Sequence, residues 1–169
     1  MKKCIFMMMS LVLLLSLAAC GAEAEPPAEK PVMIANPYGT YETAEQMQSA
    51  AELQVSLPEN LPQWVTETIY RAIPGELVEV IYKGESNEIR VRIKNGDQDI
   101  SGVYDCGPSQ EKDVTVGENP VHLKGQTTQE GEFLVLVSTW NTSEGRTYSV
   151  TSTEGVSEAP LIPILKQIR

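Results

Sequence analysis

Residues 87–94, NEIRVRIK, alternate apolar and polar side chains more regularly than any other stretch of the chain. In an extended strand, successive side chains point to opposite faces, so the charged Glu88, Arg90, Arg92 and Lys94 oppose the apolar Ile89, Val91 and Ile93. Antiparallel sheets with one face on the core and one in water have this pattern. The segment therefore predicts a half-buried sheet.

Turn residues divide the flanking sequence into further strands. Pro74-Gly75 and Gly84–Ser86 bracket one apolar run, so strands at 66–73, 76–83 and 87–94 are expected to pair antiparallel. An irregular stretch runs from Asn95 to about Gln110. Four more strands are then expected at 112–116, 120–124, 132–140 and 146–151, the last two as a hairpin around Asn141–Gly145.

A short helix is expected at each end of this strand-rich body. Thr43 and Gln46 have capping-box spacing before a rough apolar stripe of Met47, Ala50, Ala51 and Leu53. A second stripe comprises Leu161, Ile164, Leu165 and Ile168, and Pro160 and Pro163 should delay the start of that helix. The predicted fold is α+β, with one twisted antiparallel sheet of about six or seven strands and both helices packed on one face.

The N-terminus has the layout of an export signal. Lys2 and Lys3 precede an apolar run, Ile5 to Leu17, that is too short for a comfortable membrane span. The run ends in Leu17-Ala18-Ala19-Cys20, which resembles the lipobox of bacterial lipoproteins at each position. That resemblance implies a signal peptide at 1–19 and a lipid, with acyl chains such as palmitate, on the new N-terminal Cys20. The chain is then expected on the extracytoplasmic face of the cell membrane.

Residues 20–35 form an Ala/Glu/Pro-rich segment in which Pro26, Pro27 and Pro31 oppose helix and sheet. It is expected to be a tether that holds the domain up to roughly 45 Å from its anchor, at about 3.1 Å per residue. Residues 36–169 are long enough for a single extracytoplasmic domain.

Net charge argues against nucleic acid as a partner. The 13 basic and 23 acidic side chains give a formal charge of −10, which becomes −12 when Lys2 and Lys3 leave with the signal peptide. Such a chain repels phosphate backbones, and its sequence contains no cluster of Lys and Arg.

Cysteine usage bears on both stability and catalysis. Cys4 leaves with the signal and Cys20 carries lipid, which leaves Cys106 without a disulfide partner in the mature chain. Cys106 and His122 are the remaining thiol and the single imidazole, so a Cys-His nucleophilic pair is conceivable. Asp105 beside the thiol should raise its pKa, and Gly107-Pro108 offers no helix N-terminus. No catalytic residue and no enzymatic activity are therefore expected.

An acidic turn places oxygen ligands at alternate positions, Asn95, Asp97, Asp99 and Ser101, as a calcium loop does. Ile100 and Cys106 stand where such a loop has glycine and glutamate. A solvated turn is expected, with a weak cation site completed from elsewhere in the fold as the alternative. No metal and no other cofactor is predicted.

Two groups of residues are candidates for a binding face. Arg90, Arg92 and Lys94 could grip an anionic wall polymer or a partner carboxylate, or pair across strands with acids such as Glu79 or Glu85. A loop at 141–145 would set Ser138 opposite Tyr148 and place Leu136, Ser138, Trp140, Tyr148 and Val150 on one face. Trp140 and Tyr148 could then bind a sugar or peptide ring, or form the edge of the core; Trp64 has the same two interpretations.

From about Asn36 to Ile168 the chain resembles a family of Gram-positive surface lipoproteins, the domain of unknown function 4367. The matching pieces are Asn36-Pro37, the Glu42–Leu53 helix, Pro58 in VSLPENLP, ETIYRAI, VEVIYKGESNEIRVRI, DISGVYD, VTVGENPVHLKG and STWNTSEGRTYSV. The chain departs from the family pattern at Val103 and in its proline-containing C-terminal helix. The resemblance implies the fold and the location, and it brings no catalytic motif.

Three functions follow as hypotheses. The first is a non-enzymatic ligand- or partner-binding domain of a membrane-anchored surface lipoprotein. The second is an extracytoplasmic sensory or regulatory domain that acts through an envelope protein. The third is a hydrolase that uses Cys106 and His122 or a metal. The first is the one expected here.

Overall fold

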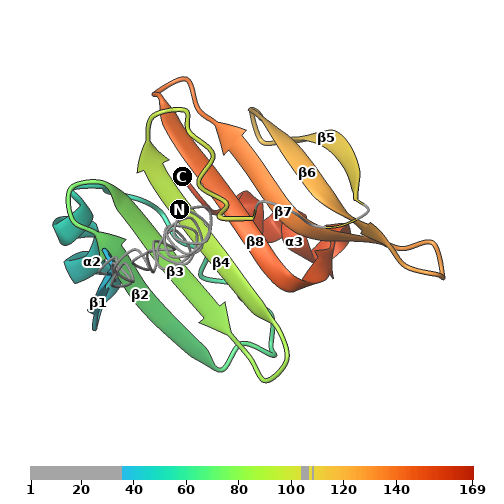
Figure 1. The fold of residues 1–169 in the computed structure, drawn as a ribbon, viewed down its shortest axis with the longest axis horizontal. Helices are drawn as coiled ribbons and strands as arrows, with labels where there is room; N and C mark the ends of the chain where they lie inside the picture. Colours follow the sequence, from blue (N-terminus) through green and yellow to red (C-terminus); the bar gives the residue numbers. More distant parts are fainter. Residues whose placement is uncertain (1–35, 104–106, 108) are drawn as a thin grey trace, which may run out of the picture. The chain divides into compact units, whose positions relative to one another are not determined.

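Eight antiparallel strands form one open sheet in the computed structural model, which describes residues 36–103, 107 and 109–169 (Figure 1). Their spatial order is β1-β2-β3-β4-β8-β7-β6-β5. Their bounds are β1 Gly39–Tyr41, β2 Glu67–Ile73, β3 Leu77–Lys83, β4 Glu88–Asn95, β5 Gln110–Val116, β6 Asn119–Thr127, β7 Phe133–Asn141 and β8 Arg146–Ser157. Two helices, α2 (Ala44–Ala51) and α3 (Glu158–Leu165), complete the fold.

The α+β class is confirmed, but the expected six or seven strands were too few. The eighth strand is β1, whose three residues pair, within the described part of the chain, with β2 alone and carry no apolar alternation that would mark them in the sequence. The signal-peptide and tether predictions concern residues 1–35, which lie outside the described residues, as does Cys106.

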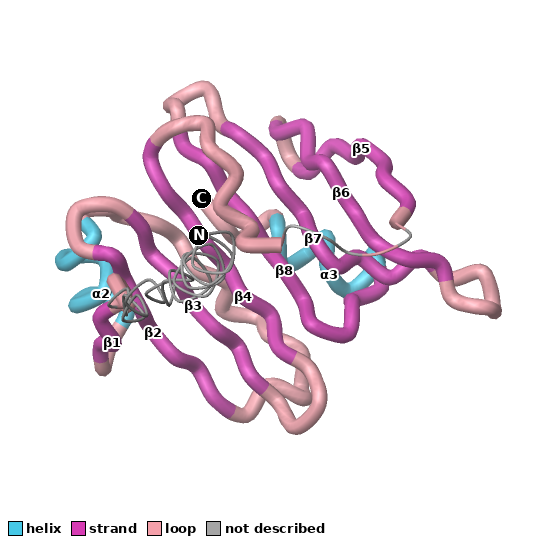
Figure 2. Tube along the Cα trace, in the orientation of Figure 1, coloured by secondary structure: helices cyan, strands magenta, loops and turns pink. Residues whose placement is uncertain are grey.

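The sheet consists of two four-stranded meanders joined where β4 pairs with β8. The chain leaves β4 near the middle of the sheet and resumes at β5, on the far edge. The described start of this connection, residues 96–103, crosses in front of β8 in the views of Figures 1 and 2. It lies on the face opposite the helices, here called the open face.

The other face carries the hydrophobic core. The apolar side of NEIRVRIK is buried as expected, with Ile89, Val91 and Ile93 all at most 1 % exposed. One continuous cluster joins these residues to both helices. From the helices and the residues just after them, it includes Met47, Ala51, Leu53, Leu161, Ile164, Leu165 and Ile168. Burial of this apolar surface is the main source of stability.

Helix α3 starts earlier than its prolines suggested. It begins at Glu158, so the expectation that Pro160 and Pro163 delay the start is wrong. Pro160 lies in the first turn, where a backbone N–H has no partner within the helix to lose. Pro163 lies inside the helix, and burial of Leu161, Ile164 and Leu165 on the sheet stabilises the turn around it.

Helix α2 begins as expected and ends in a strained residue. Thr43 caps the N-terminus by accepting a hydrogen bond from the backbone N–H of Gln46 at 3.3 Å. At the other end, Glu52 has φ 55° and ψ 32°, the left-handed conformation that favours glycine.

We expect Glu52→Gly to raise the free energy of unfolding by about 0.5–1 kcal/mol, because glycine has no Cβ to strain at this φ. Glu45→Gly, an exposed change in the first turn of the same helix, should lower it by about 1 kcal/mol, because it removes helix propensity and the contact of Glu45 with the capping Thr43. Urea denaturation of the two variants measures both effects. If Glu52→Gly is the more destabilising of the two, the left-handed cap is not a source of strain.

Candidate functional site

Cross-strand partners on the open face form one polar row over the whole sheet. Each residue lies directly opposite the next in the registers of neighbouring strands, and all are polar or charged. In spatial order from β1 to β5 this transverse row is Thr40, Arg71, Glu79, Arg92, Ser149, Thr139, His122 and Asp113. The row links a buried charge cluster on β2–β4 to a pocket over β5–β8.

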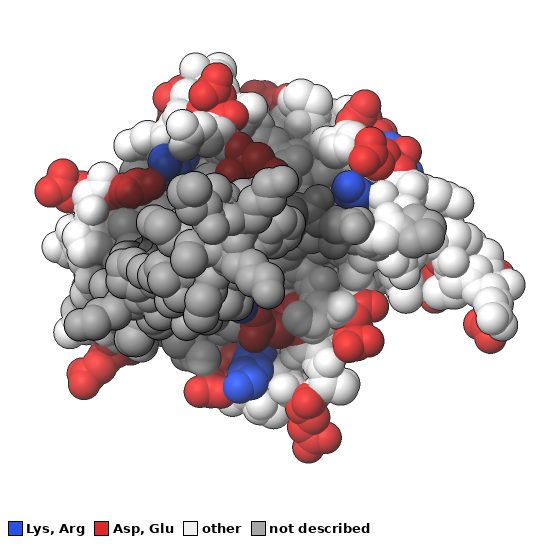
Figure 3. All heavy atoms as spheres, in the orientation of Figure 1, with Lys and Arg blue, Asp and Glu red and all other residues white. Residues whose placement is uncertain are grey.

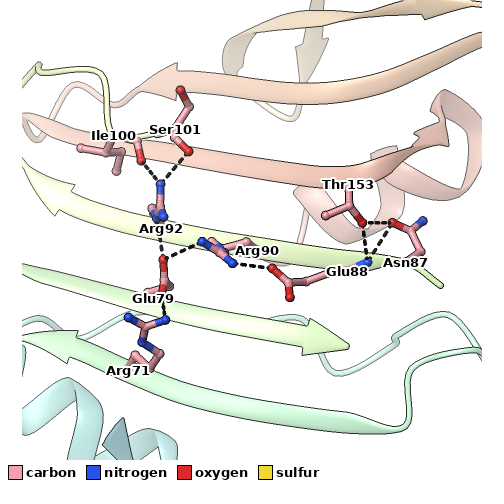
Figure 4. A network of polar contacts seen from close by, with 9 residues as sticks. All are labelled: Arg71, Glu79, Asn87, Glu88, Arg90, Arg92, Ile100, Ser101 and Thr153. Atoms are coloured by element: carbon pink, nitrogen blue, oxygen red, sulfur yellow. Dashed lines mark hydrogen bonds and ion pairs between the residues drawn. The ribbon is translucent and has the colours of Figure 1, made fainter. Parts of the chain in front are cut away.

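Glu79 is the centre of the charge cluster (Figure 4). Its side chain is 1 % exposed and faces three guanidinium groups, with Arg92 Nε at 2.6 Å, Arg71 Nη1 at 3.2 Å and Arg90 Nη1 at 3.8 Å. Burying a carboxylate costs free energy unless cations and hydrogen bonds compensate it. The three arginines supply the opposite charge, and Arg92 Nε donates a hydrogen bond to Oε2, whereas Oε1 is paired by charge alone.

The basic stripe predicted as a binding face is therefore paired with acids. Arg90 and Arg92 both contact Glu79, and Arg90 also pairs with Glu88 at 2.5 Å. Lys94 Nζ lies 2.6 Å from Glu76 Oε1. Glu85, the other acid considered, forms no ion pair with the described residues. Of the two interpretations of the stripe, the structure supports cross-strand pairing with Glu79. On the part of this face that Figure 3 leaves uncovered, the few blue basic atoms lie mostly beside red acidic ones.

Tyr38 borders the same cluster. The Arg71 guanidinium carbon lies 4.3 Å from the centre of the Tyr38 ring, a cation–π contact. Burial raises the pKa of the Tyr38 hydroxyl, and the nearby Glu79 carboxylate raises it further. Tyr38 therefore stays neutral and acts as an aromatic cover over Arg71.

Arg92 fixes the acidic turn to the open face. Its Nη1 donates to the backbone carbonyls of Ile100 and Ser101, at 3.0 and 2.6 Å (Figure 4). Within the turn, the Ser101 N–H donates to Asp99 Oδ1 at 2.8 Å. Ile100 and Ser101 are buried. The segment is thus an ordered cover over β4 and β8, and no group of three potential metal-binding side chains occurs among residues 36–103, 107 and 109–169.

Beside this cover, the open face holds a pocket of about 560 Å³, here called the open-face pocket. Its roof comes from the acidic turn and its floor from β5 to β8. The lining also includes Trp140, and the side chains with polar groups that line it are Asp97, Gln98, Asp99, Ser101, Asp113, His122, Lys124, Thr139, Asn141 and Thr147. The size is that of a small-molecule site, and the lining is mostly polar.

His122 is held by carboxylates on one wall of this pocket. Its Nδ1 lies 2.9 Å from Asp113 Oδ1, and its Nε2 lies 3.6 Å from Glu111 Oε2. The side chain is 46 % exposed, so these contacts are partly screened by water. Because Cys106 is outside the described residues, the expectation that the two do not form a nucleophilic pair stays a prediction.

Trp140 and Tyr148 stack on the core side of the sheet, with ring centres 5.0 Å apart and planes 9° apart. They are 5 % and 3 % exposed and belong to the hydrophobic core. Trp64 packs partly buried against the same core. The interpretation of these aromatic residues as the edge of the core thus fits their burial.

The register predicted for this hairpin was wrong by two residues. Tyr148 pairs with Trp140, and Ser138 pairs with Val150. Gly145, at φ 75°, closes a tight turn in which its N–H donates to Thr142 O, so the strands pair closer to the turn than a five-residue loop allows. An even shift keeps each side chain on its face, which is why Ser138, Trp140, Tyr148 and Val150 still share one. Leu136 instead falls at an irregularity between Val135 and Val137.

A second pocket, of about 620 Å³, opens on the helix side of the same sheet end and is here called the helix-face pocket. It lies between the β5–β6 turn, the β7–β8 turn and the end of α3. Its lining comprises Val116, Gly117, Glu118, Asn119, Trp140, Thr142, Ser143, Glu144, Arg146, Tyr148, Leu165, Lys166, Ile168 and Arg169. Trp140 and Tyr148, candidates from the sequence, thus reach a cavity after all.

No family model, curated protein or solved structure matches the chain in the comparisons made. The resemblance to the surface lipoproteins with the domain of unknown function 4367 therefore stays a prediction. In the described part of the chain, no helix is long and apolar enough to cross a membrane.

Proposed function

We propose that the chain is an exported lipoprotein, anchored through lipid on Cys20, whose domain binds a ligand or an envelope partner without catalysing a reaction. The N-terminal sequence supports the anchor, because a Lys-rich start and an apolar run lead to Leu17-Ala18-Ala19-Cys20. The resemblance to Gram-positive surface lipoproteins supports the same location. The membrane contact is then made by lipid, and nucleic acid is not a partner.

The observation that carries the binding function is the open-face pocket. Its floor is a rigid antiparallel sheet, and its roof is held in place by Arg92, which is itself fixed by Glu79. A preformed, ordered pocket binds without a large ordering cost. Side chains from four strands converge on it, which is the arrangement expected of a specific polar site.

Filling the pocket should abolish capture of the partner. Thr139 lies on the pocket floor, half-buried, between Ser149 and His122 in the transverse row. We expect Thr139→Arg to reduce recovery of the specific ligand or partner by at least about tenfold, because the long side chain occupies the space. The measurement is quantitative mass spectrometry of material crosslinked to the full-length protein on intact cells.

Thr115→Arg is the matched control, since Thr115 is an exposed threonine in β5 that is not part of the pocket lining. It adds the same charge and bulk at the sheet surface and should leave recovery unchanged. Equal recovery of the ligand or partner with the wild type, Thr139→Arg and Thr115→Arg would refute the open-face pocket as the binding site.

A further inference from the structure

We propose that a third pocket, beside the turn between β3 and β4, binds a small organic cation that carries an alkylated ammonium group. This pocket, here called the Trp64 pocket, has a volume of about 520 Å³ and is lined by Trp64, Thr66, Glu85, Ser86, Asn87 and Glu154. None of these residues lines the open-face pocket or the helix-face pocket. The proposal is therefore independent of the function proposed above.

The charged side chains of this lining are all acidic. Glu85 and Glu154 are exposed, and neither carboxylate forms an ion pair or a hydrogen bond with the described residues. The described lining contains no basic side chain. Lys83, the nearest basic residue in sequence, lies opposite Glu67 on the open face, whereas Thr66 lies on the other face of the sheet. A pocket lined by charges of one sign concentrates ligands of the opposite sign, here cations.

Trp64 supplies an aromatic wall. Part of its surface packs against the core, and the residue also lines the pocket. The ring is held close to the β3–β4 turn at Gly84, where a Cβ would lie only 2.7 Å from Trp64 Cε3 and 2.6 Å from the Trp64 carbonyl oxygen. Glycine permits this approach. The face of an indole ring is electron-rich and attracts a cation more strongly than the faces of the other aromatic side chains do.

Asn87 holds the two acidic segments of the pocket in place. Its Oδ1 accepts hydrogen bonds from the Glu88 N–H at 2.8 Å and from Thr153 Oγ1 at 3.1 Å (Figure 4). The same oxygen accepts from the Glu154 N–H at 3.3 Å. These bonds join the turn that carries Glu85 to the irregular part of β8 that carries Glu154. The pocket is thus formed before a ligand arrives, which lowers the entropic cost of binding.

The combination of groups selects an organic cation. Two carboxylates fall short of a metal site, and no group of three potential metal-binding side chains occurs within the described part of the chain. An anion would meet Glu85 and Glu154 without a compensating base in the described lining. An alkylated ammonium group is attracted by the carboxylates through its charge and by the Trp64 ring through a cation–π contact. The volume is that of a small-molecule site.

The two tryptophans provide a direct test. We expect choline to shift the indole N–H signal of Trp64 saturably in proton–nitrogen NMR spectra of the purified full-length chain, while the Trp140 signal stays fixed. The neutral isostere of choline, in which a tert-butyl group replaces the trimethylammonium group, should give no saturable shift. The spectrum of the Trp64→Phe variant assigns the two signals.

Removing both carboxylates, with Glu85→Gln and Glu154→Gln in one protein, should weaken choline binding about tenfold. Each carboxylate contributes an attraction that water screens only in part. The matched control combines Glu118→Gln and Glu144→Gln, which change the net charge by the same amount at exposed positions outside the Trp64 pocket. The control variant should bind choline as the wild type does.

The proposal fails if choline does not shift the Trp64 signal saturably, or if it shifts the Trp140 signal in its place. It also fails if the neutral isostere binds as choline does, or if the control variant loses as much affinity as the variant of Glu85 and Glu154. A neutral methyl glycoside that shifts the Trp64 signal where choline does not would make the pocket a sugar site and would contradict the cation.

Discussion

Replacing Glu79 with glutamine is expected to lower the free energy of unfolding by about 3 kcal/mol, at the lower end of the range for breaking a buried ion pair. The carboxylate is 1 % exposed and serves three guanidinium groups, so its loss leaves Arg71, Arg90 and Arg92 facing each other without a shared anion. Partial exposure of the arginines, 13 to 31 %, keeps the loss from being larger. The melting temperature should fall by about 10 °C.

Glu76→Gln is the matched control for this prediction. It makes the same change in the exposed pair with Lys94, where Glu76 is 49 % exposed. Surface pairs contribute little, so we expect a loss below about 1 kcal/mol. Urea denaturation of both variants gives the comparison. Similar losses in the two variants would mean that Glu79 is not the anchor of the cluster.

Replacing Cys20 with alanine is expected to abolish membrane attachment altogether. The lipobox thiol is the atom to which lipid would be joined, and the remaining sequence around it keeps its other export features. Wild-type protein should fractionate with membranes and yield no peptide from residues 1–19, whereas the variant should be neither acylated nor retained. Fractionation with mass spectrometry of the N-terminus measures both properties.

Cys106→Ala is the control for thiol loss and should remain in the membrane fraction. If the Cys20→Ala protein is cleaved, acylated and membrane-bound like the wild type, the lipid anchor is wrong. That result would leave the three pockets untouched, because all of them lie within residues 36–169.

Regular alternation made most of the sheet predictable from sequence. Ile89, Val91 and Ile93 are buried as their spacing requires, and the turns at Pro74-Gly75 and Gly84–Ser86 separate the first three long strands. Strand β1 was missed because its three residues are too few to show an alternation of apolar and polar side chains, and they are extended because they pair with β2. The early start of α3 was missed because tertiary burial outweighs the cost of Pro163.

The site was harder to predict, because it depends on register. Glu79 was foreseen as one of two partners for the basic stripe, but its burial under three arginines depends on how β2, β3 and β4 align. Thr139, Ser149 and Asp113 drew no attention as single residues. They join His122 through the registers of β5 to β8, and this row reaches Arg92 and Glu79 only where β4 meets β8, a pairing of strands more than 50 residues apart in sequence. No local motif encodes such a pairing.

Among the described residues, strand β5 ends the sheet and pairs with β6 alone. The unpaired backbone N–H and C=O groups along its seven residues could pair with a strand of another molecule and join two sheets. If many copies are held on a membrane by lipid at Cys20, as we propose, neighbouring molecules meet at high local concentration and this risk increases. Glu111, Lys112 and Asp113 place three consecutive charges on that exposed edge. These charges would keep a crowded layer of anchored molecules from growing into a shared sheet.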